Sequence, residues 1–121
     1  MNQQIKQYQV VWVSLPRLTD HFSCQSGIRP CVVISNNQCN KHSPVITVVP
    51  ITSKRKRNLP THYTLTEEEM REANLIQEST VLGEAITSIN KCCIKAIAGT
   101  LSTSAIQKVN YAVSQQLKVS C

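Results

Sequence analysis

The chain has 121 residues, of which 41 % are apolar and 17 % charged, the proportions of a folded protein rather than a disordered one. This length predicts a single domain over residues 1–121. The longest apolar stretch, residues 45–51, is interrupted by Thr47 and Pro50 and is far shorter than the roughly 20 residues that cross a membrane. The N-terminus is polar and lacks the apolar segment of a secretory signal, so we expect a cytoplasmic protein with no membrane association.

Positive charge is concentrated outside one short acidic segment. The 13 basic and 7 acidic residues give a net charge of +6. Residues 66–74 hold four of the acids and one Arg, so the rest of the chain has 12 basic residues against 3 acidic ones, a net charge of +9. The densest basic run, residues 54–57, would attract a polyanion such as RNA or DNA. A solvated surface loop is the alternative interpretation of such a run.

Short strands are predicted in the first half of the chain. Residues 10–15 are rich in strand formers and end before Pro16. After a polar loop, residues 30–35 contain a continuous apolar run, which predicts a central strand buried on both faces. The sequence then predicts a turn or short helix over residues 36–43, a strand over 45–52, and a strand near 61–65.

The acidic segment predicts a short helix. Thr66 and Glu69 have the spacing of a capping box, and the neighbouring acids in the first turn suit the positive end of the helix dipole. We expect this helix to end near Asn74. Further strands are predicted over residues 79–82, 85–89 and 94–97, with Gly83 allowing a bulge or bend.

The last predicted element is an amphipathic helix over residues 102–119. Its apolar stripe consists of Ile106, Val109, Val113 and Leu117. Many short strands followed by a terminal helix predict a small, mostly antiparallel domain that resembles a β-barrel.

The six cysteines permit more than one interpretation. A disulfide framework would suit a secreted chain, whereas reduced thiols suit a cytosolic one. A zinc site is disfavoured because no Cys-x-x-Cys pair occurs and the adjacent Cys92 and Cys93 would point to opposite faces of a strand. We therefore expect reduced thiols, no metal and no cofactor.

Two strand ends carry residues suited to phosphate. Arg29 stands at the mouth of the predicted buried strand, and Thr52, Ser53 and Lys54 stand at the end of another. A guanidinium binds phosphate through two parallel hydrogen bonds, and a hydroxyl beside it can donate a third. When each residue is considered alone, a simpler interpretation is that Arg29 forms a surface ion pair and that Thr52 is an ordinary β-branched strand residue. No Gly-rich phosphate loop or serine-hydrolase motif indicates another enzyme class.

Several segments together resemble the MazF/PemK toxin family. They are Val11-Trp12-Val13-Ser14-Leu15-Pro16, residues 25–36, Asn40-Lys41-His42-Ser43-Pro44, Pro50-Ile51-Thr52-Ser53-Lys54 and Leu59-Pro60-Thr61-His62, in the family's order and spacing. The resemblance implies a mainly β fold with a C-terminal helix, the SH3-like β-barrel of the MazF and CcdB toxin class. It also implies a homodimer, metal-independent endoribonuclease activity on single-stranded RNA, and neutralisation by a small antitoxin of the MazE type.

The resemblance also implies roles for particular residues. Arg29 matches the catalytic Arg, which stabilises the phosphorane and takes part in proton transfer, and Thr52 matches the catalytic Thr that holds the scissile phosphate. The family reaction is attack of a ribose 2′-OH on the adjacent phosphorus, which leaves a 2′,3′-cyclic phosphate and a 5′-OH. The remaining residues expected to bind RNA are Gln25, Ser53, Lys54, Leu59, Pro60, Thr61, His62, Glu84 and Phe22. The ring of Phe22 could stack on an unpaired base or pack within its own loop.

Three positions depart from the family pattern. Ser14 stands where relatives usually carry Asp, Cys24 where Glu is common, and Thr87 where many members carry Arg. These departures leave open the RNA sequence that is cut and part of the dimer contact. A CcdB-like DNA gyrase poison and an inactive RNA-binding module are the rival functions, because they would share the fold. The presence of both Arg29 and Thr52 in their motifs favours the ribonuclease.

Overall fold

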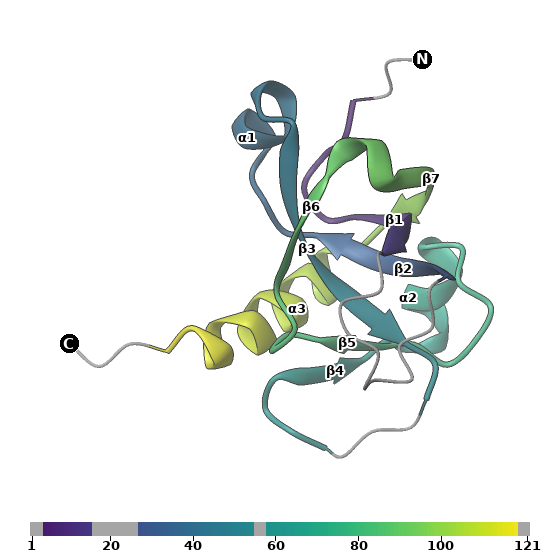
Figure 1. Cartoon of the computed structure of the whole chain (residues 1–121). Helices are drawn as coiled ribbons and strands as arrows, with labels where there is room; N and C mark the ends of the chain where they lie inside the picture. The colour runs from purple at the N-terminus through teal and green to yellow at the C-terminus, as the bar shows by residue number, and fades with distance from the viewer. Residues whose placement is uncertain (1–3, 16–26, 55–57, 119–121) are drawn as a thin grey trace.

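The computed structural model describes residues 4–15, 27–54 and 58–118 of the chain. Figure 1 shows the arrangement of the helices and strands. In chain order, the elements are β1 (Gln9–Leu15), β2 (Gly27–Val33), α1 (Asn37–His42), β3 (Val45–Thr52), β4 (His62–Thr64), α2 (Glu67–Glu72), β5 (Thr80–Leu82), β6 (Thr87–Asn90), the 3-10 helix η1 (Lys91–Cys93), β7 (Ile94–Thr100) and α3 (Thr103–Gln116).

The strands form one antiparallel sheet with the order β4-β5-β3-β2-β1-β7, and β6 also pairs with β3. The beginning of β3 pairs with β6 and its last two residues pair with β5, so β5 and β6 follow each other along one edge of β3. The predicted class, mainly β with a C-terminal helix, is confirmed. Within the described residues, no ladder joins β4 to β7, so the sheet is open rather than a closed barrel.

Strand β2 is the central strand that its apolar run predicted. Cys31, Val32 and Val33 are fully buried. The strand begins and ends earlier than predicted, because Gly27 already pairs with Leu15 of β1 and the ladder with β1 continues from there. By contrast, β3 spans Val45–Thr52 as the sequence predicted.

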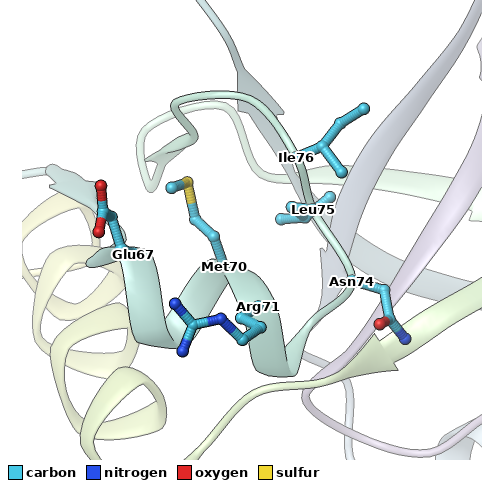
Figure 2. A pocket seen from close by; sticks show the side chains of 6 residues that line it. All are labelled: Glu67, Met70, Arg71, Asn74, Leu75 and Ile76. Carbon is cyan, nitrogen blue, oxygen red and sulfur yellow. The ribbon is translucent and has the colours of Figure 1, made fainter.

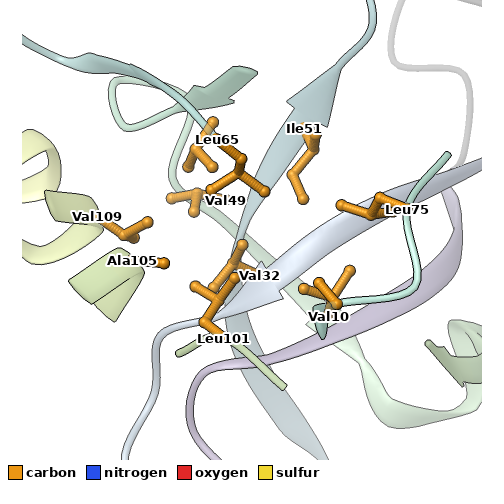
Figure 3. Close-up of a cluster of buried hydrophobic side chains, with 11 residues drawn as sticks. Val10, Val32, Val49, Ile51, Leu65, Leu75, Leu101, Ala105 and Val109 are labelled. Carbon is orange, nitrogen blue, oxygen red and sulfur yellow. The ribbon is translucent and has the colours of Figure 1, made fainter. Parts of the chain in front are cut away.

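The sheet has an apolar cluster on each face. One cluster joins Val32 and Val49 of the sheet to Val109 of α3, and Figure 3 shows how these side chains meet between the sheet and the helix. The other cluster includes Val13, Cys31 and other residues whose side chains alternate with those of the first along the same strands. The second cluster and the first therefore lie on opposite faces of the sheet.

Helix α3 packs against the first cluster with three of the four residues of its predicted stripe, Ile106, Val109 and Val113. Its fully buried residues are Ala105, Val109 and Ala112, whereas Leu117 lies beyond the end of the helix and is 59 % exposed. Ala112 is buried because α3 closely approaches Gly83, where an added Cβ would lie 2.9 Å from the carbonyl carbon of Ala112. Small residues permit this contact, and hydrophobicity alone does not reveal it.

Helix α2 has the capping box that the sequence predicted. The Thr66 hydroxyl accepts a hydrogen bond from the Glu69 backbone at 3.1 Å, and the Glu69 carboxylate accepts one from the Thr66 backbone at 3.0 Å. The helix ends in a Schellman motif, in which Asn74 takes a positive φ of 60° and Leu75 donates to the Met70 carbonyl at 2.8 Å. In the part of the chain that the structure describes, no helix is long and apolar enough to cross a membrane.

Candidate functional site

Arg29 and Thr52 lie on the same face of the sheet. Strands β2 and β3 pair in antiparallel register, with Cys31 opposite Pro50. Continued by two residues, this register sets Arg29 opposite Thr52, and alternation along each strand puts both side chains on the face of the second cluster. Both residues are half-buried. The sheet therefore joins two candidate residues that the sequence separates.

Thr52 is the last residue of β3, and its hydroxyl makes one hydrogen bond within the described residues. Its Oγ1 accepts a hydrogen bond from the backbone N–H of Lys54 at 3.2 Å. Among the described residues, no acceptor is bonded to the hydroxyl hydrogen, so it can be donated to a phosphate oxygen. Ser53 and Lys54 follow directly and are exposed.

A row of threonines continues from Thr52 across the sheet. Thr80 of β5 pairs with Thr52 on one side and with Thr64 of β4 on the other. The Thr64 and Thr80 hydroxyl oxygens lie 2.8 Å apart, and Thr80 is only 6 % exposed whereas Thr64 is exposed. The sequence alone does not reveal this row, because the row depends on which short strands pair.

His62 and Glu84 form a pair at the other end of β5. The His62 Nε2 and Glu84 Oε2 atoms lie 2.8 Å apart, with the His62 side chain 7 % exposed and that of Glu84 37 % exposed. Burial raises the pKa of the Glu84 carboxyl, but hydrogen bonds from His62, the Glu84 backbone and Thr61 outweigh it, so the pKa is lowered from its ordinary value. Glu84 therefore presents a fixed carboxylate that solvent can reach.

A backbone hydrogen bond connects the turn before β4 to the turn after β5. The His62 backbone donates to the Leu59 carbonyl at 2.9 Å, and the Gly83 backbone donates to the Thr61 carbonyl at 2.7 Å. A Cβ on Gly83 would lie 2.7 Å from that same Thr61 oxygen, so this approach needs glycine. As a result Glu84 lies beside the segment of Leu59, Thr61 and His62, although it is distant from that segment in the chain.

Strand β5 connects the two groups of candidate residues. Thr80 lies opposite Thr52, and two residues later Leu82 lies opposite His62, so all four side chains share one face. Of the remaining predicted residues, Leu59 and Pro60 are exposed beside His62. Phe22 and Gln25, together with the basic residues 55–57, lie outside the described residues.

The buried thiol of Cys31, on this face of the sheet, is not reactive. Burial raises the pKa of the Cys31 thiol to about 12, although the positive charge of Arg29 acts in the opposite direction. This thiol is protonated at neutral pH and is no nucleophile. In the described ranges, no three His, Cys, Asp or Glu side chains form a group that could hold a metal ion.

A pocket lies elsewhere, on α2 and the segment after it (Figure 2). Its lining residues are Glu67, Met70, Arg71, Asn74, Leu75 and Ile76. Leu75 belongs to the first apolar cluster, so the pocket is on the face of the sheet opposite Arg29. It is separate from the candidate site.

The fold and the candidate site define a small β domain that offers a guanidinium and hydroxyl groups on one face. Residues 6–117 match the family of PemK-like, MazF-like toxins of type II toxin–antitoxin systems, and the chain belongs to this family. It is similar to the Endoribonuclease MazF of Staphylococcus saprophyticus, with 36 % identity over 94 residues that cover 77 % of this chain and 76 % of the relative.

Solved structures share the fold. An endoribonuclease in complex with its cognate antitoxin, from a mycobacterial species, superposes with a TM-score of 0.76 at 20 % identity and covers 97 % of this chain and 98 % of its own. MazF from Deinococcus radiodurans superposes with a TM-score of 0.77 at 18 % identity, over 98 % of this chain and 100 % of its own. These likenesses show that the chain shares the fold of these proteins over nearly its whole length.

Proposed function

We propose that this chain is a sequence-selective endoribonuclease toxin that cleaves single-stranded RNA, with messenger RNA in the cytoplasm as its target. The observation that carries the proposal is the position of Arg29 and Thr52 on one face, at facing strand positions. Membership of the MazF-like family and the similarity to Endoribonuclease MazF support it. They favour cleavage of RNA over the alternative of a gyrase poison.

The proposed reaction needs positioning and charge rather than a metal. The ribose 2′-oxygen forms a bond to phosphorus, and the bond from phosphorus to the 5′-oxygen breaks. The 2′-hydroxyl loses its proton and the 5′-oxygen gains one, which leaves a 2′,3′-cyclic phosphate and a 5′-OH. Arg29 stabilises the negative phosphorane and takes part in proton transfer, while Thr52 donates to a non-bridging oxygen.

RNA would follow the face from Thr52 towards His62. Ser53 and Lys54 offer a hydroxyl and a positive charge to the backbone of the RNA. Glu84 repels phosphate, so its carboxylate suits the N–H groups on a base edge, which would give sequence preference. We assign Leu59, Pro60, Thr61 and His62 to the same path, and extend it in the proposal to Gln25 and Phe22.

The proposed partners are a second copy of the chain and an antitoxin of the MazE type. The chain outside residues 66–74 has a net charge of +9, which would attract an acidic antitoxin segment as well as RNA. Such a segment would neutralise the toxin by occupying the RNA path. Solved relatives include MazE–MazF complexes from Deinococcus radiodurans.

Single-turnover cleavage of a long RNA in EDTA tests the function. Arg29→Ala and Thr52→Val should each slow cleavage by about 10²–10³, the usual cost of one preorganised donor in such a site. Arg29→Lys should be nearly as slow, because it keeps the charge and loses the planar fork. Arg71→Ala on α2 is the control and should cleave at the wild-type rate. Fragments with 5′-phosphate ends, or normal cleavage by Arg29→Ala, would refute the mechanism.

A further inference from the structure

We propose that Thr64 is a positioning residue that keeps the hydroxyl of Thr80 away from Thr52, so that the Thr52 hydroxyl stays available for phosphate. This inference rests on the proposed ribonuclease function, because it gives Thr52 the task of holding the scissile phosphate. Thr64 itself acts through Thr80 and is separated from Thr52 by the whole width of β5.

The geometry places Thr80 between two other threonines. It lies directly opposite Thr52 on one side and Thr64 on the other, and all three side chains share one face of the sheet. Side chains in such opposing pairs have their Cβ atoms about 4.5–5.5 Å apart. Thr80 can therefore reach either neighbour with a change of side-chain rotamer.

The structure shows which neighbour Thr80 uses. Its hydroxyl oxygen lies 2.8 Å from that of Thr64, on the β4 side, so it faces away from β3. Thr80 is 6 % exposed, and a buried hydroxyl without a partner is costly. The bond to Thr64 satisfies this hydroxyl and holds the side chain in one rotamer.

The consequence falls on the hydroxyl of Thr52. The Thr52 oxygen already accepts a hydrogen bond from the Lys54 backbone at 3.2 Å, and the hydroxyl hydrogen can still be donated to an acceptor. If Thr80 lost Thr64 as a partner, its oxygen would become the nearest acceptor across the ladder for the Thr52 hydrogen. RNA would then have to break an internal hydrogen bond before Thr52 could hold the phosphate.

The test compares Thr64→Val with the double variant Thr64→Val/Thr80→Val. Thr64→Val should lower kcat/KM for RNA cleavage in EDTA by about fivefold, a factor typical of one ordinary hydrogen bond. The double variant should recover most of this loss, because valine at position 80 has no hydroxyl to divert Thr52. Thr100→Val, at an exposed position on β7, is the matched control and should cleave like the wild type.

Recovery is the result that a merely structural role would not produce. A loss in Thr64→Val that the second substitution deepens or leaves unchanged would overturn the inference and point to direct RNA contact by Thr64. If Thr80→Val unfolds the sheet, as a urea titration would show, Thr64→Val/Thr80→Ala must give the recovery instead. A wild-type protein that does not cleave RNA would refute the proposed function, whereas normal wild-type cleavage without recovery refutes this inference alone.

Discussion

His62 and Tyr63 are adjacent on β4 and point to opposite faces of the sheet, where each meets a carboxylate in a different environment. On one face, His62 pairs with Glu84, whose side chain is 37 % exposed. On the other, the Tyr63 hydroxyl donates to the carboxylate of Glu69, a residue only 5 % exposed, at 2.6 Å. The two carboxylates differ in how much of their hydrogen-bonding capacity the protein itself uses.

The protein uses both oxygens of Glu69. One oxygen accepts from Tyr63 and from the Thr66 backbone, and the other accepts from the Ser104 hydroxyl at 2.9 Å. Burial raises the pKa of Glu69, but these bonds outweigh it and the pKa is lowered. Burial and the same hydrogen bond raise the pKa of Tyr63. Glu69 thus joins β4, α2 and α3 through hydrogen bonds. Its carboxylate has little remaining capacity to accept hydrogen bonds from a substrate.

The comparison shows that a lowered carboxyl pKa does not by itself mark a functional residue. Glu69 and Glu84 share that direction of shift and a hydrogen bond to β4. Exposure separates them, because only Glu84 presents an oxygen to solvent on the face of Arg29 and Thr52. We therefore expect Glu69 to serve stability and propose that Glu84 recognises RNA.

The largest effect is expected from removal of the Glu69 carboxylate. Glu69→Ala should lower the free energy of unfolding by about 3 kcal/mol, because it removes a buried acceptor that the Tyr63 hydroxyl, the Ser104 hydroxyl and the Thr66 backbone share. Urea titration measures this change. The control Glu72→Gln, on an exposed position of the same helix, should change stability by less than about 0.5 kcal/mol. Equal effects of the two variants would contradict the structural role of Glu69.

Glu84→Gln should affect RNA cleavage strongly and stability only weakly, the reverse of the effect expected for Glu69→Ala. We expect kcat/KM for RNA cleavage to change by about tenfold, equivalent to about 1.4 kcal/mol, because an amide offers a base edge a donor in place of one acceptor. Stability should change by less than about 1 kcal/mol, since the carboxylate is partly in water. Steady-state cleavage measures kcat/KM, and urea titration measures the stability of the variant. A stable variant with unaltered cleavage and cut sites would count against the recognition role.

The smallest effect concerns pH. A lowered folded pKa means that the native protein binds fewer protons than the unfolded chain at acid pH, so stability rises with pH there. The contribution of Glu69 is complete above its ordinary pKa of 4.5 and is lost as the pH falls through the lowered value. Glu69→Gln should therefore flatten the acid limb of the stability profile, measured by thermal unfolding between about pH 3 and 6. An unchanged acid limb would show that the ionised form of Glu69 adds no stability.

Local sequence signals predicted the elements and not their partners. The β-branched residues of β3 and the Thr66–Glu69 capping box were correctly placed because both depend on residues close in the chain. The pairing of β4 with β5 was not predictable, because strands of three residues carry too little pattern to select a partner. The Thr64–Thr80 bond and the His62–Glu84 pair both follow from that pairing.

The candidate site was predicted by family resemblance more than by chemistry. Arg29 and Thr52 have simple alternative interpretations when each is considered alone, and only their shared motifs indicated a ribonuclease. The opposing strand positions of the two residues come from the register of β2 and β3, which turn lengths and packing determine rather than either motif. On α3 the predicted stripe holds except at Leu117, whereas the burial of Ala112 against Gly83 could not be predicted from hydrophobicity.

The long sequence separations within the sheet have a consequence for the time at which this protein becomes active during its synthesis. Arg29, Thr52 and Thr80 meet only when strands distant in the chain have paired, and such non-local contacts form slowly. Val109 of α3, which is made after all of these strands, completes the apolar cluster on their opposite face. The growing chain therefore lacks the support for a finished site until α3 has left the ribosome. A ribonuclease built in this order has no finished site while its own chain is still being synthesised.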